Sequence, residues 1–70
     1  MVAVEASKVR PGDELFNPRE RDPYQWSRIR SVTEHTTEEG RVYTVITTWG
    51  GVSTWKHPRE GVTIRQQTGA

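Results

Sequence analysis

The chain contains no cysteine, so neither a disulfide bond nor a thiolate metal site can stabilise its 70 residues. It also lacks any apolar run near the ~20 residues that a membrane-spanning helix needs. The first residues, MVAVEASKVR, show no charged segment followed by an apolar core, so we expect no signal peptide, a cytoplasmic location and no membrane partner. A domain this small buries only ~60% of its unfolded surface, which predicts a marginal core.

Neither sign of charge dominates, because ten Lys and Arg residues oppose nine Asp and Glu residues. A dedicated nucleic-acid-binding domain usually carries a clear basic excess, so this balance argues against one. The basic residues are unusual in type, since eight of the ten are arginine. A guanidinium suits bidentate recognition of carboxylate or phosphate and stacks on aromatic rings. Scattered surface arginine is also ordinary, and the count alone therefore names no ligand.

No group of residues has the spacing of a catalytic or metal site. Ser53 and His57 would share one face of a strand but lie ~13 Å apart at strand rise, and nothing brings Asp13 close to them. His35 and His57 lack the HxH or HExxH spacing of a metal site. The Gly50-Gly51 pair lacks the helix and lysine that follow a phosphate-binding loop. We therefore predict no enzymatic activity, no catalytic residue, no metal and no cofactor.

The densest β-forming stretch is RVYTVITTWGGVSTW, residues 41–55. β-Branched and aromatic residues favour strands, and the glycine pair interrupts them as the turn of a β-hairpin does. The rest of the chain is short, polar or rich in turn residues. Its few apolar side chains must therefore pack against this hairpin.

Two registers are open for this hairpin. A two-residue glycine loop places Ile46 opposite Trp55. A three-residue loop that includes Trp49 and ends in a glycine bulge places Val45 opposite Trp55. We prefer the second register because it groups Tyr43, Val45 and Trp55 on one face, which we expect to be buried, and leaves Trp49 exposed at the turn.

Short strands and turns alternate along the remainder of the chain. Arg10-Pro11-Gly12-Asp13 has the residues of a type II turn, and TTEEG at 36–40 forms another turn with two glutamates at its tip. Ile29 and Val32 differ in parity, so a β-bulge near Arg30-Ser31 is needed to point both inward. Residues 17–24, NPRERDPY, form a long charged loop. Further strands are expected near residues 2–5, 14–16, 26–35 and 62–65, with a turn at 57–61. At most one helical turn is expected, near residues 6–9 or in the 57–61 connection.

These elements predict an all-β domain, a small barrel of five or six short antiparallel strands over residues 1–66, with a disordered polar tail at 67–70. Whether the first strand closes the barrel or pairs with another chain is left open, as is the oligomeric state. The predicted core is Val9, Leu15, Ile29, Val32, Val45, Trp55, Val62 and Ile64.

The order of elements resembles an SH3-like small β-barrel of the KOW or Tudor kind. The resemblance spans about Ser7 to Arg65 and rests on layout, with R-P-G-D-x-L at residues 10–15 as its one local motif. The ALYDY motif and paired loop acids of peptide-binding SH3 domains are missing, so the resemblance does not imply binding of proline-rich ligands. The chain also resembles short proteins of actinobacteria and their phages, which implies no function.

Three tryptophans and two tyrosines are many for 70 residues. They can fill a small core from its rims, or they can form a surface that binds a partner. A protein partner is favoured by the balanced charge, and a nucleic acid by the interleaving of arginine with aromatics. We predict that the chain is a non-catalytic binding module, for a protein first and for nucleic acid as the alternative. The expected contact residues are Trp49, Tyr24, Arg28, Arg30, Arg19 and Arg21.

Overall fold

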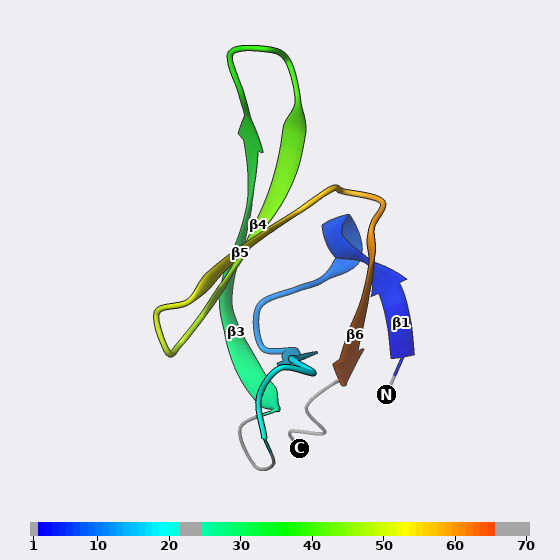
Figure 1. The fold of residues 1–70 in the computed structure, drawn as a ribbon, viewed down its shortest axis with the longest axis vertical. Helices are drawn as coiled ribbons and strands as arrows, with labels where there is room; N and C mark the ends of the chain where they lie inside the picture. Colours follow the sequence, from blue (N-terminus) through cyan, green and yellow to red (C-terminus); the bar gives the residue numbers. More distant parts are fainter. Residues whose placement is uncertain (1, 22–24, 66–70) are drawn as a thin grey trace.

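The computed structural model describes residues 2–21 and 25–65. These residues form one antiparallel sheet of six strands in the order β1-β6-β2-β3-β4-β5 (Figure 1). The strands are β1 (Val2–Glu5), β2 (Glu14–Phe16), β3 (Trp26–Thr36), β4 (Val42–Thr48), β5 (Ser53–Lys56) and β6 (Gly61–Arg65), with a 3₁₀-helical turn at Ala6–Lys8. The all-β prediction with six short antiparallel strands is thus confirmed. The residues of the tail at 67–70 lie outside the described part.

The long strand β3 organises the sheet, since it pairs with β2 through its first residues and with β4 through the rest. The register with β4 shifts between Ile29 and Ser31, so the predicted bulge is present and Ile29 and Val32 both face the core. Within the described residues, the end strands β1 and β5 do not pair, so the sheet bends strongly without closing into a barrel. The β3–β4 hairpin projects beyond the rest of the domain (Figure 1).

The turns follow the glycine and proline signals of the sequence. Asp13 N–H donates to Arg10 O at 3.2 Å and Gly12 has φ of 96°, as a type II turn requires. In the β4–β5 hairpin, Thr48 N–H donates to Val52 O at 2.9 Å and Gly51 has φ of 87°. This is the three-residue loop with a glycine bulge, and Val45 lies opposite Trp55 as preferred.

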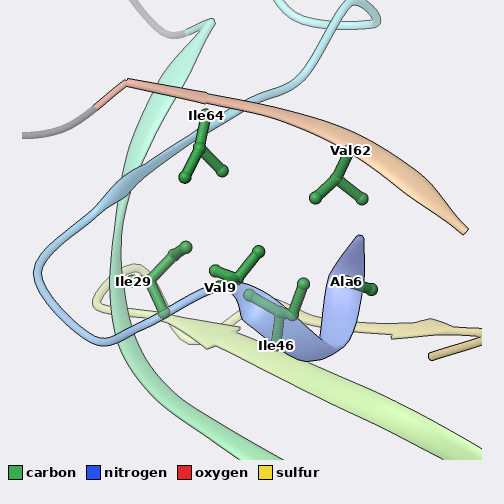
Figure 2. Close-up of a cluster of buried hydrophobic side chains, with 6 residues drawn as sticks. All are labelled: Ala6, Val9, Ile29, Ile46, Val62 and Ile64. Carbon is green, nitrogen blue, oxygen red and sulfur yellow. The ribbon is translucent and has the colours of Figure 1, made fainter. Parts of the chain in front are cut away.

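The core consists of small and β-branched side chains. Figure 2 shows Val62 and Ile64 pointing from β6 toward the other members of the cluster, which come from β3, β4 and the segment after β1. Leu15 and Val32 are half-buried and pack against this cluster. Its fully buried apolar members are Ala6, Val9, Ile29, Ile46, Val62 and Ile64.

The predicted inner face of the β4–β5 hairpin was wrong, although its register was right. Trp55 is 51% exposed and Val45 only half-buried, while Ile46 on the opposite face is fully buried. Thr44 and Thr48 flank Ile46 on that face and are also buried. A row of threonines around one isoleucine fits a core of valine and isoleucine, in which a Trp55 indole would be too large.

The turn before β6 forms backbone hydrogen bonds with the segment that follows β1. Ala6 N–H donates to Glu60 O at 2.9 Å, and Ser7 N–H donates to Pro58 O at 3.0 Å. Lys56 at the end of β5 forms an ion pair with Glu60, with 2.9 Å between Nζ and Oε2. The pKa of Glu60 lies below its ordinary value because Lys56 donates a hydrogen bond to its carboxylate and adds a positive charge nearby.

We expect Ile46→Ala to lower the free energy of unfolding by about 2–5 kcal/mol, because it removes a fully buried side chain from a tightly packed core. Trp55→Ala should cost only about 1–2 kcal/mol, since an aromatic pair contributes ~0.5–1.5 kcal/mol. Urea denaturation followed by circular dichroism measures both. Equal losses for the two variants would mean that Trp55 lies in the core.

The Lys56–Glu60 pair predicts a pH dependence of defined sign. A carboxylate whose pKa is lowered by folding stabilises the fold above its ordinary pKa and loses that contribution as the pH falls through the folded value. The wild-type chain should therefore be more stable than Glu60→Gln at pH 7, and the difference should shrink to nothing in acid. Thermal unfolding of both chains between pH 7 and about pH 3 tests this. A difference that grows on acidification would contradict the ion pair.

Candidate functional site

The aromatic residues that the structure describes lie outside the core. Side chains alternate between the two faces of a strand, so the face opposite Ile29, Ile46 and Ile64 is defined here as the outer face. None of the fully buried apolar residues among those described is aromatic. Trp26 is half-buried and Trp49 is 66% exposed. The alternative that the tryptophans fill the core from its rims is therefore wrong.

Trp26 lies at the start of β3 in a cluster on this outer face. Its ring centroid lies 5.1 Å from that of Phe16, the residue paired with it on β2. The guanidinium carbon of Arg65 lies 4.5 Å from the centre of the same indole, a cation–π contact between β6 and β3. Arg65 also bonds to Glu14, with 3.0 Å between Nη2 and Oε2. Glu14 stands between Arg65 and Arg28 in the sheet.

A second cation–π contact lies farther along β3. The guanidinium carbon of Arg30 lies 5.2 Å from the centre of the Trp49 ring. The turn holds Trp49 there, because Trp49 N–H donates to Arg28 O at 3.1 Å and Gly51 N–H donates to Thr48 O at 3.0 Å. A strongly exposed indole thus has a fixed backbone and a stacked cation beside it.

These two contacts define one surface, the Arg/Trp stripe, which consists of Trp26, Arg28, Arg30, Trp49 and Arg65. Trp26, Arg28 and Arg30 follow one another at alternate positions of β3, so they share the outer face. Among the described residues of β2, β3 and β6 on this face, Glu14 is the acid that accompanies the three arginines. Other acids lie elsewhere: Glu38 and Glu39 are exposed in the β3–β4 turn.

The predicted contact residues are partly united by this stripe. Trp49, Arg28 and Arg30 lie together in it. Arg19 and Arg21 are exposed in the loop between β2 and β3, where Arg19 N–H donates to Asn17 Oδ1 at 3.0 Å. Tyr24, the remaining predicted contact residue, lies outside the described residues.

Reasoning from the sequence missed two members of the stripe, Trp26 and Arg65, and also Phe16, which packs against Trp26. A signal for Trp26 is present, because Trp26-x-Arg28-x-Arg30 places an aromatic and two cations on one face of any strand. Phe16 and Arg65 have no comparable local pattern. They lie beside Trp26 only because the fold places β2 between β3 and β6.

A hollow of about 980 Å³ adjoins the Trp26 end of the stripe. Its lining includes Phe16, Arg19 and Trp26 together with Thr54 and Lys56 of β5 and Val62 of β6.

Residues considered for catalysis have separate partners. Ser53 Oγ lies 3.0 Å from Thr47 Oγ1, and His57 Nδ1 accepts the Arg59 N–H at 3.2 Å. The Asp13 carboxylate accepts the Arg10 N–H at 3.2 Å. Within residues 2–21 and 25–65, no three His, Asp or Glu side chains gather as metal ligands, and no helix is long and apolar enough to cross a membrane.

Comparisons with protein-family models, curated proteins and solved structures return no match to this chain. The chemistry of the outer face is therefore argued from its own residues. Indole rings that are open to solvent stack with other flat π systems, and guanidinium groups bind phosphate or carboxylate. The Arg/Trp stripe combines both kinds of group on one face of the sheet.

Proposed function

We propose that this chain is a non-catalytic binding module that holds a single-stranded nucleic acid on the Arg/Trp stripe. One observation carries the proposal: Arg65 over Trp26 and Arg30 over Trp49 stand on either side of Arg28 along the same face. A single strand offers unpaired bases that stack on indole rings and phosphates that pair with guanidinium groups.

The stacked geometry suits this ligand. An arginine above an indole can still donate its N–H groups to phosphate oxygens, and the contact restricts its motion before binding. The opposite side of an exposed indole, as in Trp49, is free to take a base. Stacking does not read sequence, because every base has a π face, so we expect weak sequence preference.

The distribution of charge supports nucleic acid over a protein partner for this surface. Net charge of +1 favoured a protein in the sequence, but that sum includes acids that lie away from the stripe. Three arginines with one neighbouring glutamate make the stripe locally basic. Phosphates meet this excess of positive charge directly, whereas a protein would need a matching acidic surface.

Salt dependence gives the first test. Binding of fluorescein-labelled dT12 and rU12 is measured by fluorescence anisotropy over a range of salt concentrations. For single strands, each neutralised phosphate contributes about −0.7 to the slope of log K against log salt. Three arginines that each neutralise one phosphate therefore predict a slope near −2, and one contact more or fewer changes it by about 0.7. Arg28→Gln should reduce the slope by about 0.7, and the matched control Arg59→Gln, an exposed arginine in the turn before β6, should not.

A flat salt dependence, or equal effects of Arg28→Gln and Arg59→Gln, would reject the stripe as a phosphate site. A 12-base-pair duplex is the competitor that separates single strands from duplexes. If the duplex competes as well as dT12, then unstacked bases are not what the surface binds.

Trp49→Ala tests stacking separately from charge. The indole is 66% exposed, so the variant should keep its thermal stability, while its affinity for dT12 should fall about fivefold or more, given ~1–3 kcal/mol per stacked base. Its salt slope should stay unchanged because no charge is lost. Unchanged affinity in a folded Trp49→Ala chain would exclude Trp49 from the site.

A further inference from the structure

A second aromatic cluster lies on the outer face beyond the Arg/Trp stripe. The ring of Trp55 lies 4.9 Å from that of His35 and 5.9 Å from that of Tyr43, both in edge-to-face arrangement. Tyr43 is paired with His35 across β3 and β4, and Trp55 stands on β5 opposite Val45. Edge contacts hold the indole in place, and half of its surface stays exposed.

The outer face between the stripe and this cluster is uncharged. The register of β3, β4 and β5 places only hydroxyl-bearing and apolar side chains there: Ser31, Thr33, Val45, Thr47 and Ser53. Among the described residues of these strands, Glu34 and Lys56 are paired with Thr44 and so point to the inner face. No carboxylate on this part of the three strands would therefore repel a phosphate chain that crosses it.

We propose that the nucleic-acid strand continues from the Arg/Trp stripe across β3 and β4 to Trp55, which stacks a further base. This inference rests on the proposed function. The stripe supplies the charge, and the far cluster adds stacking without adding a phosphate contact. Along β3, Trp26 and His35 are nine residues apart, roughly 30 Å at strand rise, so a very short oligonucleotide that pairs with the arginines of the stripe does not also cover the whole path.

The observations favour a nucleic-acid strand over a second copy of the chain on this face. The two aromatic clusters lie on the outer face of the same sheet, and the one in the stripe is basic, which favours phosphates over a second copy that carries the same positive charge there. Self-association through Trp55 is therefore the competing outcome of the test.

Length dependence separates the far cluster from the stripe. OB-fold domains that bind single strands take ~4–16 nucleotides each, so we use dT4 and dT12, with rU4 and rU12 for RNA, as the short and long ligands. We expect Trp55→Ala to weaken dT12 about fivefold or more and to change dT4 less than twofold, with the salt slope unchanged. Trp49→Ala should weaken both lengths. Trp55→Phe, which keeps a stacking ring, should recover part of the dT12 affinity.

A measurement on the wild-type chain covers the case in which Trp55→Ala does not fold. In a ¹⁵N heteronuclear correlation spectrum, dT12 should shift the Trp55 indole N–H and the Thr33 and Val45 amides, and dT4 should shift only signals near Arg28 and Arg30. Full affinity of a folded Trp55→Ala chain for dT12, or no shift at Trp55, overturns the extended path and leaves the stripe intact. A dimer of the wild-type chain that Trp55→Ala abolishes assigns the cluster to self-association. Failure of every oligonucleotide to bind rejects the proposed function together with this inference.

Discussion

The structure depends on the bulge between Ile29 and Ser31. Without it, Ile29 and Val32 could not both point inward. Strand β3 could then not pair with both β2 and β4 while the sheet bends around a single core. The same irregularity sets the outer face. Arg30 is left without a partner in the register, and its side chain reaches the Trp49 ring in the adjacent turn. One extra residue thus both completes the core and positions a cation.

The composition of the core explains why the outer face is aromatic. Alanine, valine and isoleucine fill the small interior, and the buried threonines Thr44 and Thr48 complete it. The Thr48 hydroxyl donates to Val52 O at 3.4 Å, so burial leaves that group with a partner. The indole rings are too large for this space and lie at the surface. There Trp26 and Trp49 lie against arginine, Trp55 makes edge contacts with His35 and Tyr43, and Trp49 and Trp55 stay largely exposed.

Much of the fold could be predicted from the sequence because turn chemistry is local. The Pro11-Gly12 turn, the glycine bulge after Trp49 and the parity conflict at Ile29 and Val32 each specify the backbone within a few residues. The inner face of β4 could not be predicted the same way. Hydrophobicity favours Tyr43 and Val45 as core residues over Thr44, and only the size of the assembled interior reverses that choice. Closure of the sheet likewise depends on strands far apart in sequence.

The residues of the candidate site also differ in whether local sequence could predict them. Arg28, Arg30 and Trp49 could be named because they are near neighbours of one strand and one turn. Arg65 could not, since its contact with Trp26 arises from the insertion of β2 between β3 and β6. Net charge sums over the whole chain, whereas a ligand meets only the charges that the sheet collects on one face, so the sequence could not locate a basic surface.

The outward position of the indoles also governs how this chain behaves in a spectrometer. Tryptophan emission usually reports folding because water leaves the rings as the core forms. Here Trp49 and Trp55 remain in water in the folded state, and Trp26 lies beneath a guanidinium group. Folding should consequently shift the emission little, and a soluble quencher should reach two of the three rings in the native chain. The intrinsic fluorescence of this protein is a reporter of its surface.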